Sequence, residues 1–238
     1  MKKIMSLEMM NKQQAARELV EIGKRLYAKG MVAANDGNIS IRLDERQILI
    51  TPSGVSKGFM KAEEMVRLDS EGRVLSRFGQ PSSEVYMHLE IYKNRTDINS
   101  ICHAHPPYAT AFAATGKTMR TDLLSEVAIA LGEIPLVKFA VPGTPALAAA
   151  LIPYLKEHVA LLLANHGVVT LGESALQAYY RMETVEHAAK IQYLAQSLGQ
   201  PLALSRQQLE QIKRAEKEKL IEDITRDILE NLNSGKDE

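Results

Sequence analysis

The sequence predicts a sheet covered by helices on both faces, an α/β or α+β fold. Three observations predict it: strand pairs come early, helices are interspersed among the later strands, and the chain ends in long helical segments. Because hairpins join antiparallel strands, we expect a largely antiparallel sheet. The 238 residues are enough to bury a substantial core. We expect one domain over 1–238, with a core at about 12–200 and a charged helix at about 205–232.

The first third of the chain reads as one helix followed by short strands. Residues 11–30 carry apolar side chains at helical spacing, and Gly30 is typical of a helix C-cap. Two alternating segments flank "DERQ", which is the pattern of a hairpin, and two shorter ones flank the turn "SEG". The strands are therefore expected at 38–43, 47–51, 65–69 and 73–76.

The rest of the chain alternates helices with buried strands. Pro106 and Pro107 end one strand, and Thr144 followed by Pro145 is typical of a helix start. Two apolar strands are joined by a tight "HG" link. We expect helices at 84–94, 108–116, 144–158, 173–199 and 205–232, and strands at 98–105, 159–165 and 168–172.

The overall composition excludes several classes of protein. The formal net charge is zero with His neutral, so no overall field recruits nucleic acid or an anionic membrane. Cys102 is the single cysteine, so no intramolecular disulfide forms, which fits a reducing compartment. Residues 1–14 read as a disordered lead-in, and no run approaches the roughly 18 apolar residues of a membrane span. We expect a cytoplasmic protein.

Two histidines two residues apart suggest a metal site. Side chains two apart on a strand point to the same face, so His103 and His105 project together. Two neutral imidazoles on one side can bind one cation at about 2.0–2.1 Å each. The prolines that follow would leave His105 at the rim of the strand. The alternative is a pair of half-buried structural histidines.

His166 and Glu84 extend the candidate site. His166 lies between two apolar strands, and Gly167 after it permits a turn conformation and the close approach of another group. The alternative is a histidine that caps turn carbonyls. Glu84 falls near the start of a helix, where the helix N–H groups favour a negative charge. Acidic residues are also common in the first turn of a helix without any functional role. Ser82 and Ser83 before it are frequent N-caps, and with helix N–H groups they would form an anion site. Three histidines and a carboxylate match a zinc site with an open position for substrate. The remaining histidines are expected to be structural or at the surface: His88, His158 and His187.

Five motifs in order resemble the class II aldolase/adducin family. They are "ANDGNISIRL", "ILITPSGVSKG", "PSSEVYMHLEIY", "ICHAHPPYATAFA" and "LLANHGVVTLG", which together run from about residue 34 to 172. The resemblance implies a three-layer α/β/α fold with a central, mainly antiparallel sheet. It also implies a homotetramer with active sites near the subunit interfaces.

The resemblance implies roles for individual residues as well. Zn²⁺, one per subunit, would be bound by Glu84, His103, His105 and His166, and Glu84 would also act as acid/base. Mn²⁺, Co²⁺ or Fe²⁺ fit the same ligand types. The activity implied is cleavage of a ketose 1-phosphate, L-fuculose 1-phosphate or a 5-deoxypentulose 1-phosphate, to dihydroxyacetone phosphate and an aldehyde. The substrate phosphate would lie against Asn38, Ser53, Gly54, Ser82 and Ser83.

The sequence departs from the family's aldolases where they carry an active-site tyrosine. The stretch 118–133 contains none, and offers Asp122 or Glu126 instead, or no substitute. No tyrosine follows Tyr193. Pentulose-phosphate 4-epimerase, decarboxylase and methylthioribulose-1-phosphate dehydratase activities therefore remain alternatives, although the glutamate of "SSE" favours the aldolase over the epimerase. An interaction module without catalysis, like the adducin head, is the alternative of a different class. An amidohydrolase barrel is excluded because too little sequence follows "HAH".

Overall fold

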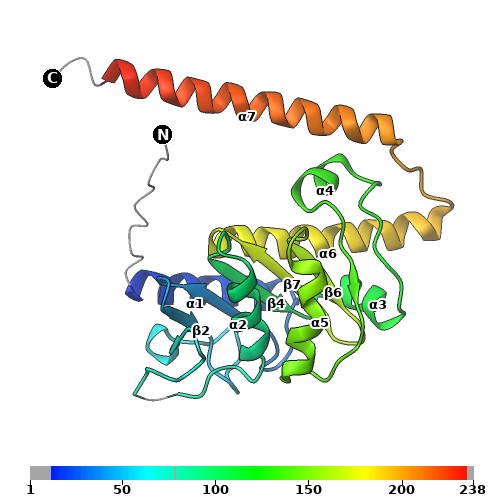
Figure 1. The fold of residues 1–238 in the computed structure, drawn as a ribbon. Coiled ribbons are helices and arrows are strands. Elements are labelled where there is room, and N and C mark those ends of the chain that lie inside the picture. The colour runs from blue at the N-terminus through cyan, green and yellow to red at the C-terminus, as the bar shows by residue number, and fades with distance from the viewer. Residues whose placement is uncertain (1–11, 78, 235–238) are drawn as a thin grey trace.

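The computed structural model of the chain describes residues 12–77 and 79–234, and its centre is one mixed sheet (Figure 1). Its strand order is β3-β2-β1-β4-β7-β6-β5. Neighbouring strands are antiparallel except β5 and β6, which are parallel at one edge. The prediction of a mainly antiparallel sheet is therefore confirmed. The strands are β1 (Asn38–Arg42), β2 (Gln47–Ile50), β3 (Val66–Asp69), β4 (Ser100–Ala104), β5 (Leu136–Val137), β6 (Ala160–Leu163) and β7 (Gly167–Gly172).

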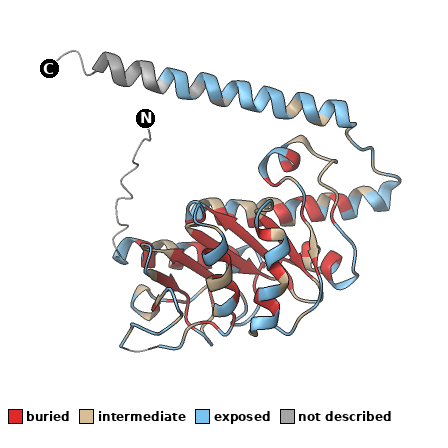
Figure 2. Cartoon of the chain, in the orientation of Figure 1, coloured by how far each residue is buried: buried red, intermediate tan, exposed pale blue. Residues whose placement is uncertain are grey.

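Helices cover both faces of this sheet, which confirms the predicted three-layer α/β/α fold. On one face lie α1 (Lys12–Ala28), α3 (Pro107–Ala114) and α6 (Ala175–Leu198). On the other lie α2 (Val85–Asn94) and α5 (Pro145–Leu155), packed against each other. The buried residues concentrate in the strands and in the helix faces turned toward them (Figure 2). The remaining helical elements are η1 (Ala62–Glu64), α4 (Ser125–Ala130) and α7 (Arg206–Ser234).

Strand β4 shows how the sheet separates its two cores. Cys102 and Ala104 belong to the core formed with α1 and α6, whereas Ile101 belongs to the core formed with α2 and α5. Because side chains alternate along a strand, His103 falls on the face that carries α2. The period of the strand therefore directs this histidine toward the helix that begins after Glu84.

Two segments differ from the prediction. The strand expected at 73–76 is reduced to one bridge between Leu68 and Val74. The reason is that the carboxylate of Asp69 holds the turn, where it accepts hydrogen bonds from the backbone N–H and the guanidinium of Arg73. Helix α4 and the two-residue strand β5 lie in a stretch without a prediction. A strand of two residues is too short to show a period, and it forms because β6 supplies its partner.

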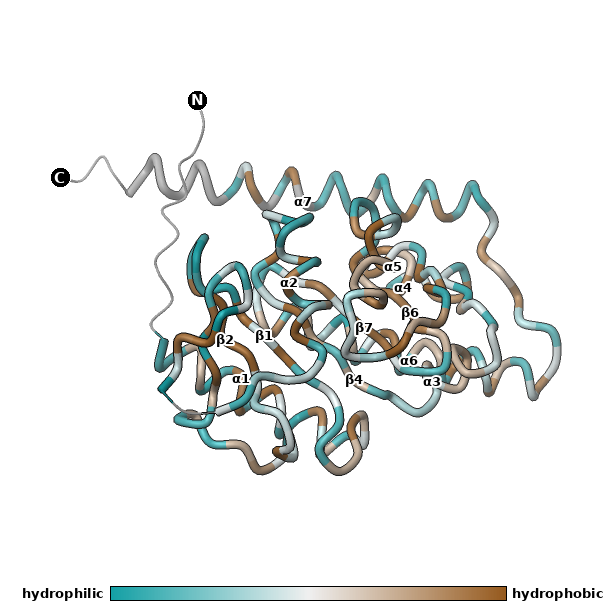
Figure 3. Tube along the Cα trace, turned by 60° about the horizontal axis from the view of Figure 1, so that its bottom comes forward, coloured by the Kyte–Doolittle hydropathy of each residue, from teal (hydrophilic) through white to brown (hydrophobic). Residues whose placement is uncertain are grey.

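The long C-terminal helix α7 lies at the surface. Its approach is fixed by Leu204, whose N–H donates to the carbonyl of Asp122. Hydrophilic residues dominate the coloured part of α7 (Figure 3). Its apolar residues Ile221 and Ile224 are exposed. In the described ranges, no helix has the length and apolarity needed to cross a bilayer. Residues 1–11 of the lead-in expected at 1–14 lie outside the described residues, whereas residues 12–14 are not a lead-in but the first residues of α1.

Candidate functional site

The three predicted metal histidines meet at one end of the sheet. His103 lies on β4, His105 lies one residue beyond its end, and His166 lies in the link between β6 and β7. Each offers one ring nitrogen, and these three nitrogens lie within 4.8 Å of one another. The ring centroids are 4.7–5.1 Å apart. His103 and His105 lie 63 and 61 positions before His166 in the sequence, and the sheet brings them together because β4 and β7 are neighbours.

The link between β6 and β7 has two local requirements. Asn165 adopts a left-handed backbone with φ 55°, a conformation that asparagine tolerates better than most residues. Gly167 is needed for space: a Cβ there would lie 2.6 Å from the carbonyl oxygen of Ala104 and 2.6 Å from Cδ2 of His105. A turn conformation and a close approach were both expected at Gly167, and the structure shows only the close approach, because Gly167 is the first residue of β7. The left-handed residue is Asn165.

Glu84 lies opposite these histidines at the N-cap of α2. Its Oε2 is 2.9 Å from Nε2 of His103, and its Oε1 is 3.1 Å from Nε2 of His166. Although it lies this close to His166, Oε1 is buried without a hydrogen-bond partner among the residues that the structure describes. In contrast, Oε2 accepts a bond of 2.7 Å from the amide Nδ2 of Asn38. The two carboxylate oxygens are thus in different environments.

The tautomers of the histidines follow from their outer contacts. His103 donates from Nδ1 to the carbonyl of Val168 at 2.8 Å, which leaves the lone pair of Nε2 facing the site. Nε2 of His105 is 3.2 Å from that nitrogen. Nδ1 of His105 is 3.4 Å from Oδ2 of Asp36, which provides the outer carboxylate often found behind a metal-binding histidine. Lone pairs that converge with a carboxylate fit a divalent cation.

The charges of these groups are coupled. Burial raises the pKa of Glu84, but the imidazoles of His103 and His166 outweigh burial and hold that pKa well below its usual range. Burial lowers the pKa of His103, while the Glu84 carboxylate raises it by more. Burial together with the charges of His103 and His166 lowers the pKa of His105 to about 4. The site therefore keeps Glu84 ionised and His105 neutral near pH 7, as metal ligands must be.

Two of the segments proposed to bind phosphate lie side by side. Pro52 and Pro81 form an isolated bridge, the N–H of Ser53 donates to the carbonyl of Gln80, and the N–H of Ser82 donates to Thr51. Of the predicted contacts, Ser53, Gly54 and Ser83 are exposed, and Gly54 has φ +72°. Ser82 is nearly buried, and its hydroxyl accepts a bond from the N–H of Glu84. These residues form a polar edge next to Glu84.

The side chain of Asn38, predicted to contact the substrate phosphate, bonds Glu84 and His88 in the structure. The side chain is 2% exposed, and both ends of its amide are occupied by Glu84 and His88. A role in phosphate binding stays a prediction for this residue.

Two further residues near the site, Asp36 and Lys57, were not predicted from the sequence. Lys57 is buried, and its Nζ donates to the carbonyls of Asn35 and Val55 at 3.0 and 2.7 Å. Burial lowers its pKa to about 8, although the charge of Asp36 opposes this shift. Lys57 thus ties the loop that carries Asp36 to the loop that follows Ser53. A lysine in a loop gives no sequence signal for burial, because most lysines there are solvated.

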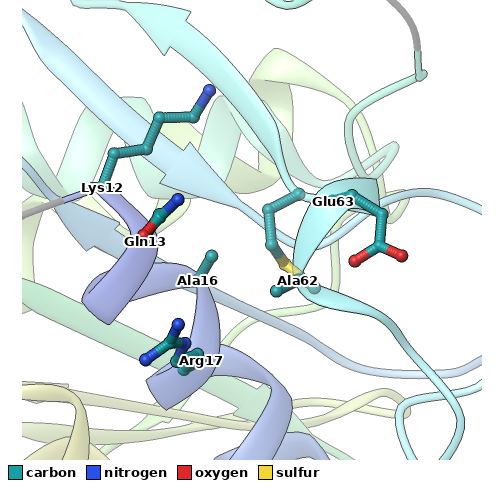
Figure 4. A pocket seen from close by; sticks show the side chains of 7 residues that line it. Lys12, Gln13, Ala16, Arg17, Ala62 and Glu63 are labelled. Carbon is teal, nitrogen blue, oxygen red and sulfur yellow. The ribbon is translucent and has the colours of Figure 1, made fainter.

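A surface pocket elsewhere on the molecule contains none of these groups. It lies between α1 and η1 and has a volume of about 420 Å³ (Figure 4). Its lining consists of Lys12, Gln13, Ala16, Arg17, Ala62, Glu63 and Met65. With one acidic side chain and no histidine, it offers no set of ligands comparable to the site at the end of the sheet.

Comparisons with known proteins identify the family of this chain. The profile of the Class II Aldolase and Adducin N-terminal domain matches residues 17–193, so the chain belongs to the class II aldolase and adducin family. It is similar to the L-fuculose phosphate aldolase of Methanococcus maripaludis, with 35% identity over 181 residues, 76% of this chain and 97% of the relative. It is 32% identical over 201 residues to the 5-deoxy-D-ribulose 1-phosphate aldolase of Bacillus thuringiensis, covering 84% of this chain and 94% of the relative.

A solved structure also matches. The structure of an L-fuculose 1-phosphate aldolase superposes on this chain with a TM-score of 0.81 and 32% sequence identity, over 88% of this chain and 99% of the aldolase chain. The family and the fold predicted from the five motifs are confirmed. Helix α7 lies beyond the residues that the family profile matches.

Proposed function

We propose that the protein is a zinc-dependent aldolase that cleaves a ketose 1-phosphate, L-fuculose 1-phosphate or a 5-deoxypentulose 1-phosphate, to dihydroxyacetone phosphate and an aldehyde. The observation that carries the proposal is the convergence of His103, His105 and His166 opposite Glu84. Relatives that share about a third of the sequence over most of their length are aldolases of such sugar phosphates. Zn²⁺ is proposed because three imidazoles and a carboxylate are a common zinc ligand set.

The reaction needs one group to stabilise charge and one to move a proton. A bound divalent cation supplies Lewis-acid stabilisation of the negative charge that develops on the oxygens next to the broken bond. When the bond between C3 and C4 breaks, C3 keeps the electron pair, and the hydroxyl on C4 becomes the aldehyde by giving its proton to solvent. C3 then takes a proton to become the CH₂OH of dihydroxyacetone phosphate.

Glu84 is the group we propose for the proton transfer to C3. Its Oε1 has no hydrogen-bond partner, so that oxygen can bind and release a proton without breaking an existing bond. Ser53, Gly54, Ser82 and Ser83 would bind the phosphate away from the reacting carbons, which fixes the orientation of the substrate. The neighbouring loops that carry these residues support this assignment.

The proposal also includes a cytoplasmic homotetramer with active sites near its interfaces, built from a single domain. Phe139 and Val141 support an interface near the site, because they are 60% and 58% exposed. Gly143, two residues on, lies close to Ser83: a Cβ there would be 3.2 Å from the Ser83 carbonyl oxygen. Light scattering on the purified protein would measure the number of subunits, and a monomer would contradict this part of the proposal.

The experiment that tests the activity is a coupled assay for dihydroxyacetone phosphate. Zn²⁺-loaded protein is offered the 1-phosphates of L-fuculose, L-rhamnulose, 5-deoxyribulose and methylthioribulose. We expect release from at least one substrate and loss of turnover in Glu84→Gln. If no substrate yields dihydroxyacetone phosphate while bound Zn²⁺ is confirmed, the aldolase proposal is wrong. Analysis of the products would then separate the epimerase, decarboxylase and dehydratase alternatives, and an unchanged substrate pool would leave the adducin-like alternative.

A further inference from the structure

A line of buried polar side chains leads from Glu84 away from the site, between β1 and α2. Asn38 and Ser40 come from β1, and His88 and Tyr92 come from successive turns of α2. All four are at most 5% exposed. The hydrogen bonds run from Oε2 of Glu84 to Asn38 at 2.7 Å, from Asn38 to His88 at 2.5 Å, from His88 to Ser40 at 2.6 Å and from Ser40 to Tyr92 at 2.8 Å.

The direction of every bond in this line follows from the carboxylate at its end. An ionised carboxylate only accepts, so the amide of Asn38 must present Nδ2 to Glu84 and Oδ1 to His88. Nε2 of His88 must then carry the proton, and its Nδ1 accepts from the hydroxyl of Ser40. Since the single hydroxyl proton of Ser40 is used, its Oγ accepts from the phenol of Tyr92. Every donor in the line therefore points toward Glu84.

This direction requires a neutral His88. Burial, with a smaller effect from the charge on His103, lowers the pKa of His88 to about 3, so the ring is neutral at physiological pH. A turned amide of Asn38 would place two acceptors against each other at Glu84 and two donors against each other at His88. The N–H of His88, which lies on the side of Asn38 away from Glu84, thus prevents the amide from turning over.

We propose that His88 is a positioning residue for Glu84, because it fixes the Asn38 amide that holds Oε2 beside His103 and leaves Oε1 beside His166. The role of Glu84 as metal ligand and proton carrier rests on the function proposed above. The network donates to one carboxylate oxygen: Oε2 accepts from Asn38, whereas Oε1 is buried without a hydrogen-bond partner in the described part of the chain. The spacing of four residues between Glu84 and His88 places both on one side of α2.

A matched pair of substitutions separates positioning from general stability. In His88→Gln, the terminal amide can reach the position of Nε2 and donate to Asn38. In His88→Asn, the shorter amide can replace Nδ1 toward Ser40 but does not reach Asn38. Both variants bury one amide at the same site, so a difference between them reports on the bond to Asn38.

The readout is the affinity of the metal-free protein for Co²⁺, titrated by its absorption spectrum on folded protein. We expect His88→Asn to lose about 10–100-fold in affinity, as is usual for groups that orient metal ligands, and His88→Gln to stay close to the wild type. Turnover, where a substrate is known, should fall in kcat more than it rises in KM for His88→Asn. In the background of Glu84→Gln, the same change should have little further effect on affinity.

The proposal is wrong if both variants bind Co²⁺ like the wild type and differ only in stability. It is also wrong if the His88→Asn loss is undiminished in the Glu84→Gln background. If His88→Asn does not fold, His88→Gln and Tyr92→Phe remain informative: both keep the bond to Asn38, and a large loss of Co²⁺ affinity in either contradicts the proposal. Because the titration needs no sugar phosphate, a protein that binds Co²⁺ normally but cleaves no substrate would contradict the proposed function alone.

Discussion

Replacing Gly167 by alanine tests whether the close approach of β7 to β4 positions the metal ligands. A Cβ at this position would lie 2.6 Å from the carbonyl oxygen of Ala104, 2.6 Å from Cδ2 of His105 and 3.4 Å from Cε1 of His103. The first two distances are well inside van der Waals contact. The backbone of Gly167 is outside the left-handed region, so the effect comes from these contacts alone.

The magnitude follows from the cost of overpacking. Adding a methyl group to a filled site costs about 1–3 kcal/mol, because neighbouring atoms must shift. The oxygen of Ala104 belongs to the sheet and moves little, so the ring of His105 is the group that yields. If the cost is borne by the metal-bound state, the affinity for the metal falls by about 5- to 150-fold, since 1.4 kcal/mol is a factor of ten.

The assay is a Zn²⁺ or Co²⁺ titration of metal-free Gly167→Ala against a chelator of known affinity. Gly172→Ala is the matched control at the opposite end of β7. A Cβ there would lie 2.5 Å from the backbone nitrogen of Ala178 and 2.9 Å from the carbonyl oxygen of Ser174, with no site residue nearby. We expect Gly172→Ala to lose stability and keep the metal affinity of the folded protein. Equal metal affinity in the two folded variants would refute the reasoning.

Three other substitutions or conditions have expected outcomes. Arg95→Met should lower the free energy of unfolding by about 1–3 kcal/mol at unchanged turnover, measured in urea, because Nη1 of Arg95 donates to the carbonyls of Leu155 and His158 at 2.6 and 3.3 Å. Burial raises the pKa of the Cys102 thiol to about 12, so an aromatic disulfide reagent should modify it only as fast as the protein unfolds. Because the folded-state pKa of His88 is about 3 against 6.5 when unfolded, only the unfolded chain takes up this proton below pH 6.5. The stability of the wild type relative to His88→Gln should therefore fall by about 1.4 kcal/mol per pH unit on acidification from pH 6.5 toward 3.

Each of these outcomes has a direct contradiction. Unchanged urea midpoints in Arg95→Met would mean that water replaces the guanidinium at no cost. Modification of Cys102 much faster than unfolding would mean that the thiol is reached from the native state. A difference in stability between wild type and His88→Gln that does not vary from pH 6.5 to 4 would mean that folded His88 binds the proton as the unfolded chain does.

The candidate metal ligands were predictable because each carries a local signal. His103 and His105 share a strand face, His166 interrupts two apolar strands, and Glu84 begins a helix. What the local pattern could not give is the partner of each group. Asn38 reads as one polar residue at a strand start, and only the pairing of β1 with β4 and the position of α2 place its amide between Glu84 and His88.

Residues that act from loops were the least predictable. Asp36 reaches His105 from a loop with no period, and Lys57 is buried because two loops close over it. Their placement depends on loop conformation, which long-range contacts decide. The same is true of β5, whose two residues become a strand only because β6 offers free hydrogen-bonding groups beside them.

By itself the sequence determined the layered fold, the family and the identity of the four candidate metal ligands, because apolar periodicity and short motifs are local properties of the chain. The tertiary structure alone decided which oxygen of Glu84 is held, which tautomer His88 takes and why Gly167 must lack a side chain. Those features depend on atoms brought within 3 Å of each other by strand order and helix packing, and sequence distance contains no information on such contacts.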